Sequence, residues 1–489
     1  MIKIKIDPKR KIFYWGPADG QPVFPDFWNL GTFIFSRIYQ PGWPPNVIFY
    51  EKGKLVFVCD HKKLHDDGEK IFKKYVLSKT RFKKAYAKWQ KDLKNFILIK
   101  NKIEKTNLSS LADVDLRKLF SKFISIYNRN FWRNGLLPEM AGWGGEQLLV
   151  KELRNRIRDE SDFIQALESL TAPEDLSFYQ KESMDLLAIA LEKDNKKRGE
   201  RLAEHQKKYF WMLNSYHHVQ ILPISFFGKN LGGITAERAR KKIREIEKIK
   251  KETIKNKKKT AKRHKLPKTI LTIGRQLAFC IWWQDLRKSF IFQANYVISL
   301  FLKEFSGRYR VKSDNLFFYT VGDLESLVSG RAVSEDEIVR RKKGFLVYAD
   351  PGEEMIHLFS GIAAQKTFQR YAKKSVEKNI QELRGLVVNR GNVTGRVKIV
   401  LSPREIGKMK KGDILVTTMT TPDYIVALRK ASAVVTDEGG MTCHAAIVSR
   451  ELKIPGIVAT KIATKVLHDG DLVEVRANHG VVKILKRKS

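Results

Sequence analysis

Hydrophobic and polar positions along this chain follow two different periods. Up to about residue 375, apolar side chains recur mainly at intervals of three and four, which is typical of amphipathic helices. The helical patterns cover residues 70–100, 114–131, 146–170, 236–262 and 270–305. From about residue 382, apolar residues instead form short runs of the kind that favours strands. The pattern predicts an α+β multidomain chain, with a mostly helical N-terminal region followed by a C-terminal β/α domain.

The helical region contains shorter β-like pieces. Residues 47–50 and 54–58 are strand-like runs separated by Glu51-Lys52-Gly53, which predicts a hairpin. Residues 316–320, followed by 321–327, suggest a strand, a turn and a helix. We expect three parts. These are a small mixed α/β part over 1–110, a mostly helical part over 111–375, and the β/α domain over 382–489.

Several classes of protein do not fit this composition. There is no apolar run of about eighteen residues, so no membrane span is expected. The first residues alternate like a strand and lack the apolar stretch of a signal peptide. Cys59, Cys280 and Cys443 are too widely spaced to suggest disulfides or a zinc site. These features favour the reducing cytoplasm.

The charge is strongly positive. The chain has 93 Lys and Arg against 53 Asp and Glu, a net charge of +40. Residues 238–268 alone carry 16 basic and 3 acidic side chains. Such a balance is compatible with a nucleic-acid partner, with phosphate-bearing ligands or with a lysine-rich solvated surface. No groove-reading helix or zinc finger is visible, so nucleic acid is not the expected partner.

One segment near the C-terminus has the pattern of an anion site. The apolar run 433–436 predicts a buried strand, and Gly439 and Gly440 then interrupt it. Thr442 is the expected N-cap of a helix over 445–452. His444 would therefore be an exposed residue in the first turn of that helix.

The first turn of a helix favours negative charge. Its backbone N–H groups have no partner within the helix, and the helix dipole is positive there. A phosphoryl group on His444 would be stabilised in this position.

The whole string resembles a known family. From Gly439 onward it runs Gly-Gly-Met-Thr-Cys-His-Ala-Ala-Ile-Val-Ser-Arg-Glu-Leu. This is similar to the phosphohistidine loop of phosphoenolpyruvate-utilising enzymes, which include phosphoenolpyruvate synthase, pyruvate phosphate dikinase and rifampicin phosphotransferase. The stretches 412–416, 421–424 and 468–475 resemble the strand, Thr-Pro-Asp turn and closing hairpin of the same domain. The resemblance covers roughly 382–486 and implies a swivelling phosphohistidine domain.

The resemblance implies roles for particular residues. His444 would be the nucleophile that takes up and carries a phosphoryl group. The phosphate oxygens would be held by Gly439, Gly440, Thr442, Cys443 and Arg450. For Arg450 an alternative is open, because it could instead balance the charge of Glu451. No metal ligand set is expected, because the adjacent His217 and His218 point in different directions on a helix.

A phosphoryl relay also needs a donor and an acceptor. No nucleotide-cradling loop or ATP-grasp domain is visible, so no cofactor is expected on this chain. ATP and Mg would belong to an ATP-grasp subunit acting in trans. Residues 130–350 weakly resemble the acceptor-binding helical segment of rifampicin-phosphotransferase-like proteins, which implies a small-molecule acceptor. Two alternatives remain: a non-catalytic ligand-binding or regulatory protein with the same fold, and a basic nucleic-acid-associated protein.

Overall fold

A computed structural model describes residues 4–371, 380–440 and 443–488. It contains two compact units. The first comprises residues 1–147, 215–218 and 297–489, and the second comprises residues 148–214 and 219–296. No helix in the described part of the chain combines the length and the apolar character that a bilayer crossing requires.

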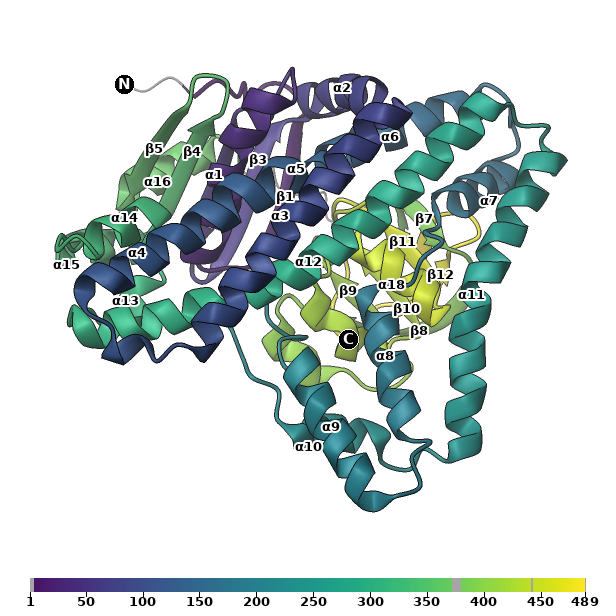
Figure 1. The fold of residues 1–489 in the computed structure, drawn as a ribbon. Helices are drawn as coiled ribbons and strands as arrows, with labels where there is room; N and C mark the ends of the chain where they lie inside the picture. The colour runs from purple at the N-terminus through teal and green to yellow at the C-terminus, as the bar shows by residue number, and fades with distance from the viewer. Residues whose placement is uncertain (1–3, 372–379, 441–442, 489) are drawn as a thin grey trace. The chain divides into compact units, whose positions relative to one another are not determined.

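The first unit contains a five-stranded antiparallel sheet assembled from both ends of the chain. Its strands are β1 (Ile12–Asp19), β2 (Asn46–Glu51), β3 (Lys54–Asp60), β4 (Phe345–Asp350) and β5 (Met355–Ser360). Their spatial order is β1-β3-β2-β4-β5, so the purple and green strands of Figure 1 lie side by side. The hairpin expected at 47–58 is confirmed, because β2 pairs with β3 and Glu51 faces Lys54.

Helices cover both faces of this sheet. The period of two in β2 and β3 sends Phe49 and Phe57 to opposite faces. The Phe49 ring stacks on Phe368 of α16 (Gly361–Gln369) with 4.2 Å between ring centroids. The Phe57 ring meets Trp28 of α1 (Val23–Ile38) edge to face at 5.5 Å. Aromatic side chains therefore pack on both faces of β2 and β3.

Other helices of the first unit precede its C-terminal sheet in the sequence. They are α2 (His61–Ile71), α3 (Lys79–Lys105), α4 (Asp113–Ile124), α5 (Trp132–Gly135), α13 (Ser313–Leu316), α14 (Val321–Leu327) and α15 (Glu335–Lys343). The expected strand at 316–320 is wrong, because Leu316 ends α13 and Tyr319 N–H donates to the Leu316 carbonyl in a turn. The helix expected over 321–327 is confirmed. Thr320 and Asp323 form a capping box at its start.

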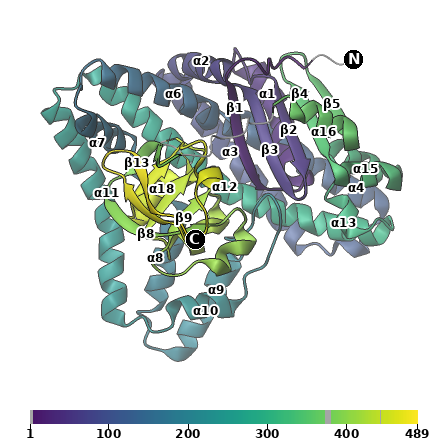
Figure 2. The ribbon, with the colours of Figure 1, turned by 180° about the vertical axis from the view of Figure 1, so that it is seen from behind.

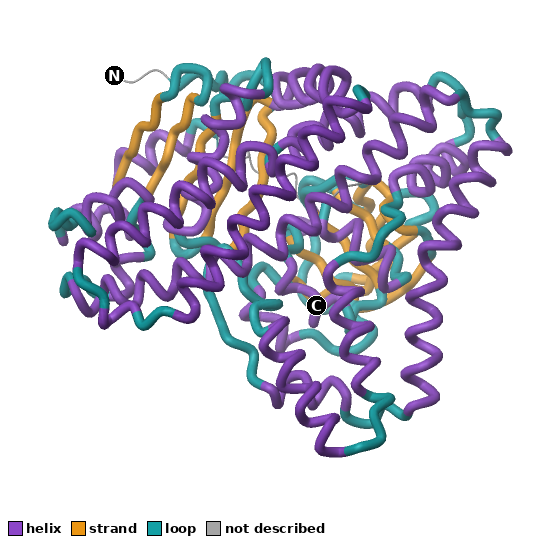
Figure 3. The backbone as a smooth tube through the Cα atoms, viewed as in Figure 1, coloured by secondary structure: helices purple, strands orange, loops and turns teal. Residues whose placement is uncertain are grey.

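The second unit consists of helices joined by loops and contains no strand among its described residues, as Figure 3 shows with helices in purple. Its own helices are α7 (Glu160–Thr171), α8 (Phe178–Ile189), α9 (Asn195–Tyr209), α10 (Ile224–Leu231) and α11 (Ala236–Arg263). Parts of α6 (Leu137–Arg154) and α12 (Lys268–Arg308) complete it. The helices expected over 236–262 and 270–305 are confirmed.

The C-terminal part of the first unit is built on an eight-stranded mixed sheet. The strands are β6 (Glu382–Arg384), β7 (Leu386–Asn389), β8 (Asn392–Ile399), β9 (Ile414–Thr417), β10 (Ala433–Thr436), β11 (Gly456–Val458), β12 (Leu472–Arg476) and β13 (Val481–Lys486). Their order is β6-β13-β12-β8-β9-β10-β11-β7. Strands β8 to β11 are parallel, and the outer pairs are antiparallel. Figure 2 shows this sheet in yellow-green.

Two short helices cover the faces of the parallel strands. Val435 of β10 packs in an apolar cluster with Ala463 and Val466 of α19 (Ala463–Val466). The helix α18 (His444–Leu452) lies against β7, β10 and β11. Short loops and the helix α17 (Ile425–Leu428) complete the segment.

The fold class expected from the sequence is confirmed: a mostly helical N-terminal region with a small sheet, then a C-terminal mixed β-sheet region. The finer division into 1–110, 111–375 and 382–489 stays a prediction, because the two packed units divide the chain on a different basis.

Candidate active site

Three parallel strands end at the same edge of the C-terminal sheet. β9, β10 and β11 run side by side, with Val434 opposite both Leu415 and Gly456. The segments that follow these strands must therefore meet, as they do at the carboxyl edge of other parallel sheets. The described parts of these segments, residues 418–424, 437–440 and 459–462, form the candidate site.

Hydrogen bonds tie the three loops together. The backbone N–H of Asp437 donates to Thr417 O at 3.1 Å, and that of Glu438 donates to Thr418 O at 2.9 Å. The Asp437 carboxylate accepts from Thr464 N–H at 2.9 Å and also from the Thr464 hydroxyl. Lys461 N–H donates to the Asp437 carbonyl at 2.8 Å. The central loop is thus anchored on both sides before it reaches the glycines.

His444 is the first residue of α18, so its expected place in the first helical turn is confirmed. It is not exposed as expected, because only 6% of its surface is accessible. Its Nδ1 lies 2.8 Å from the hydroxyl oxygen of Thr420, which is also buried. The sequence did not single out Thr420. The only signal was its position beside the Thr421-Pro422-Asp423 turn.

Cys443, rather than Thr442, is the N-cap of this helix. Its Sγ accepts the Ala446 N–H at 3.4 Å. Burial raises the pKa of the Cys443 thiol, so it stays protonated at neutral pH. The thiol therefore caps the helix. Thr442 lies outside the described residues.

The two glycines of the loop have different environments. Gly439 has φ +132°, and a Cβ there would lie 2.8 Å from Cys443 Sγ, so only glycine fits. At Gly440 a Cβ would meet the Glu146 carboxylate at 3.1 Å. The loop therefore has a carboxylate beside it. The roles of Gly439, Gly440 and Cys443 as phosphate ligands stay predictions.

Arg450 lies further along the same helix. Its Nε donates to the Ala446 carbonyl at 2.9 Å. This bond holds part of the guanidinium against its own helix and favours neither of the two roles considered for Arg450, which stay predictions.

Asp423 is a buried carboxyl in the loop after β9. It accepts from the Thr421 hydroxyl. Burial raises the pKa of Asp423 to about 7, against an ordinary value of 3.8.

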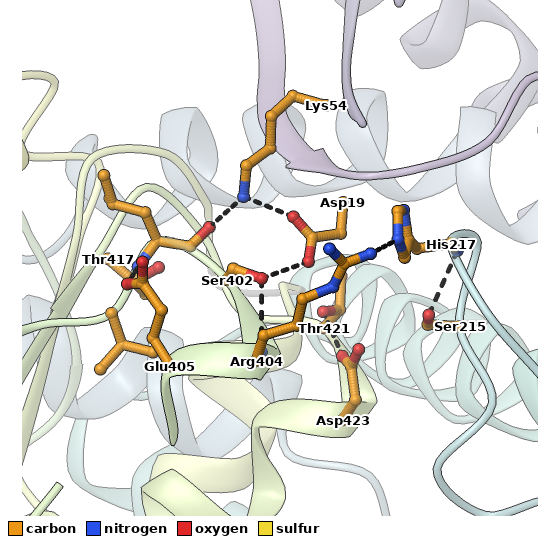
Figure 4. A network of polar contacts seen from close by, with 12 residues as sticks. Asp19, Lys54, Ser215, His217, Ser402, Arg404, Glu405, Thr417, Thr421 and Asp423 are labelled. Atoms are coloured by element: carbon orange, nitrogen blue, oxygen red, sulfur yellow. Dashed lines mark hydrogen bonds and ion pairs between the residues drawn. The ribbon is translucent and has the colours of Figure 1, made fainter. Parts of the chain in front are cut away.

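A second polar cluster lies outside this motif (Figure 4). Lys54 Nζ pairs with the Asp19 carboxylate and donates to the Leu401 carbonyl at 2.7 Å. The Ser402 hydroxyl donates to the other oxygen of Asp19. The hairpin of the N-terminal sheet is thereby joined to the segment after β8.

Arg404 extends the same cluster to His217. A guanidinium can only donate, so His217 Nε2 accepts from Arg404 Nη2 and the ring proton lies on Nδ1. Burial, and then the charge of Arg404, lowers the pKa of His217 to about 4. His217 is neutral at physiological pH. Sequence reasoning considered it only as a metal ligand, because nothing in the local pattern connects residue 217 with residue 404.

Within the described ranges, no group of three or more His, Cys, Asp and Glu side chains is arranged to hold a metal ion.

Comparison with known proteins identifies part of the chain. Residues 409–480 match the family model of the PEP-utilising enzyme mobile domain. A probable phosphoenolpyruvate synthase of Archaeoglobus fulgidus is 53% identical over 120 residues, covering 23% of this chain and 16% of the relative. The phosphoenolpyruvate synthase of Aeropyrum pernix is 49% identical over 124 residues, covering 24% and 15%. That of Pseudomonas aeruginosa is 40% identical over 118 residues, covering 24% and 15%.

The likeness is partial. The chain spans 15–16% of the length of these relatives. Among solved structures, the holo-form of aconitase X from Thermococcus kodakaraensis is 23% identical and covers 22% of this chain and 98% of that chain, with a TM-score of 0.18. So low a score supports no inference. Residues 409–480 form a PEP-utilising enzyme mobile domain, which implies phosphotransfer. The chain is related to phosphoenolpyruvate synthases over its C-terminal part only.

Proposed function

We propose that this chain is a component of a cytoplasmic phosphotransferase in which His444 carries the phosphoryl group. An ATP-grasp subunit acting in trans, with ATP and Mg, would phosphorylate His444. A small-molecule acceptor bound by the region 111–375 would then receive the group. The observation that carries the proposal is the place of His444 at the start of α18, inside the segment that matches the mobile domain.

The first half of the reaction needs an imidazole nitrogen with a free electron pair. In the tautomer that suits this role, Nδ1–H donates to the Thr420 hydroxyl, across the observed 2.8 Å, and Nε2 keeps its pair. That pair forms the N–P bond while the bond from phosphorus to the leaving oxygen of the donor breaks. Thr420 would thereby fix the orientation of the ring.

The second half of the reaction transfers the phosphoryl group from His444 to the acceptor. An oxygen of the acceptor forms a P–O bond as the P–N bond breaks, and the imidazole takes back its electron pair. The proton of the acceptor hydroxyl passes to solvent, while Nε2 recovers its electron pair and Nδ1 keeps its hydrogen, so the histidine returns to its neutral form. Between the halves, the first turn of α18 would stabilise the added charge of about −2.

The experiment compares the wild-type chain with His444→Asn. Each is incubated with a candidate ATP-grasp partner and with ATP labelled on both the β and γ phosphates. We expect acid-labile label on the wild type and none on the variant. Asn keeps a group that can bond Thr420, so the fold should be retained at a loss of about 1 kcal/mol.

Two controls make this experiment decisive. His468→Asn removes an exposed histidine of the same segment and should be labelled like the wild type. Circular dichroism should show equal folded signals for all three proteins. Equal labelling of wild type and His444→Asn would exclude His444 as the carrier.

A further inference from the structure

A cavity of about 470 Å³ lies in the first unit, apart from the loop that carries His444. Its size is within the range of small-molecule sites. Main-chain hydrogen bonds hold its walls together: Gln21 N–H donates to Tyr216 O at 2.8 Å, and Val23 N–H donates to Phe317 O at 3.1 Å. The wall is therefore set by three segments that are far apart in sequence.

Two cations reach the cavity from different segments. Lys342 lies beside it, and its Nζ donates to Asn315 Oδ1 at 2.7 Å and lies 5.8 Å from the centre of the Phe318 ring. Arg404 also lines it. A guanidinium has five N–H groups, so the contact of Arg404 with His217 leaves others for a ligand. The cavity includes one carboxylate, that of Asp314, so one positive charge remains in excess.

The rest of the cavity lining offers aromatic surface and polar atoms that can orient a bound ligand. Phe317 and Phe318 are partly buried rings at the cavity wall. The buried Oε1 of Gln21 has no hydrogen-bond donor within reach among the described residues. His218 also lines the cavity, with its Nδ1 3.3 Å from the Ser215 hydroxyl oxygen.

We propose that this cavity binds a small molecule that carries an aromatic ring and one anionic group, a carboxylate or a phosphate. Arg404 and Lys342 contact the anion, Phe317 and Phe318 contact the ring, and Gln21 accepts a hydrogen bond from a donor of the ligand. The identification of this ligand as the phosphoryl acceptor rests on the proposed function, but its binding does not.

The position of Arg404 in the sequence has a consequence for the cavity. It precedes the mobile-domain match at 409–480, whereas the other lining residues precede residue 343. The site is therefore complete only while the segment 401–405 keeps its contacts with Asp19, Lys54 and His217. Ligand binding stabilises that arrangement, because a ligand stabilises the state that binds it.

The test is an NMR titration of the full-length, unphosphorylated chain with phenyl phosphate and, separately, benzoate. The two probes distinguish a phosphate from a carboxylate ligand. Inorganic phosphate and benzyl alcohol represent the anion and the ring alone. We expect phenyl phosphate, benzoate or both to bind saturably at one site, at least tenfold tighter than inorganic phosphate or benzyl alcohol.

Matched variants locate the site. Arg404→Gln and Lys342→Gln should each weaken the preferred probe about tenfold, the effect of losing one charge-assisted contact. Lys343→Gln removes the neighbouring exposed lysine, which does not line the cavity, and should bind like the wild type. Unchanged affinity of both Arg404→Gln and Lys342→Gln for the preferred probe would overturn the proposal. Binding of inorganic phosphate or benzyl alcohol as tight as that of the preferred probe would also overturn it.

His444→Asn separates this inference from the proposed function. If the variant binds the probe normally and the wild type never shows phosphotransfer, the cavity assignment is supported and the proposed phosphotransferase function is contradicted. If the wild type shows phosphotransfer but neither probe binds saturably, the proposed phosphotransferase function is supported and the cavity assignment is contradicted.

Discussion

His444 and His217 are both buried imidazoles, and each lies close to a polar side chain. The neighbour of His444 is the Thr420 hydroxyl, which can donate or accept. The neighbour of His217 is the Arg404 guanidinium, which can only donate. The difference shows how one residue type serves two purposes. A hydroxyl leaves the tautomer of His444 adjustable, which suits a carrier, whereas Arg404 holds His217 as a neutral acceptor, which suits a structural or recognition role.

The two sites should also differ in the sign of their pH dependence. The candidate active site contains Asp423, a carboxyl whose pKa is raised, and the second polar cluster contains His217, an imidazole whose pKa is lowered. A raised carboxyl pKa destabilises the fold as the pH rises, and a lowered imidazole pKa destabilises it as the pH falls.

The largest effect is expected for Asp423→Asn. The folded-state pKa of Asp423 is about 7 and its unfolded value is 3.8, so the wild type loses stability as the pH rises through this window. The neutral amide removes that dependence. We expect the variant to be more stable than the wild type at pH 8, by up to about 4 kcal/mol, with little difference at pH 4. Urea unfolding at both pH values measures this, with Glu382→Gln, an exposed acid, as control. A constant difference across the range would contradict it.

The next effect is expected for His217→Gln. The pKa of His217 is about 4 in the folded state and 6.5 in the unfolded state, so its contribution to stability is complete above pH 6.5 and is lost as the pH falls to 4. The loss is at most about 3 kcal/mol. Glutamine can still accept from Arg404 but does not titrate, so the variant should show a smaller loss of stability between pH 7 and pH 4. Identical slopes for the two proteins would show that His217 is not held neutral.

A smaller effect is expected for Thr420→Val, which tests the role given to the hydroxyl. Valine has nearly the same shape but cannot bond Nδ1 of His444, so the ring loses its orientation. We expect phosphorylation of His444 to slow about tenfold, equivalent to about 1.4 kcal/mol. Thr420→Ser restores the hydroxyl and should recover most of the rate. Equal rates for valine and threonine would mean that another group orients the ring.

The smallest effect is expected for Cys443→Ser. A serine hydroxyl is a stronger acceptor than sulfur and can cap the same Ala446 N–H. The melting temperature and the labelling of His444 should therefore change little. A loss of labelling with an unchanged fold would indicate that the thiol has a chemical role.

The parts of the molecule that the sequence predicts best are those in which neighbouring residues decide the structure. Gly439, Cys443 and His444 lie within six positions, so the glycine loop, the helix start and the resemblance to phosphoenolpyruvate-utilising enzymes are visible in one short string. The long helices over 236–262 and 270–305 were predicted for a similar reason, since their amphipathic period extends over many turns. The N-cap of α18 was nevertheless predicted one residue too early, at Thr442 instead of Cys443, because cysteine is a rarer cap than threonine.

Only the tertiary structure decided which distant residues meet. The five-stranded sheet takes β4 and β5 from about 300 residues after β3, and no local period indicates that pairing. The same holds for Thr420 beside His444, for Arg404 beside His217 and for the cavity near Gln21. Burial and the approach of charges set the pKa values of Asp423 and His217, and both depend on the packing of separate segments. The sequence determined the chemical groups and their local frames, and long-range packing determined which of them act together.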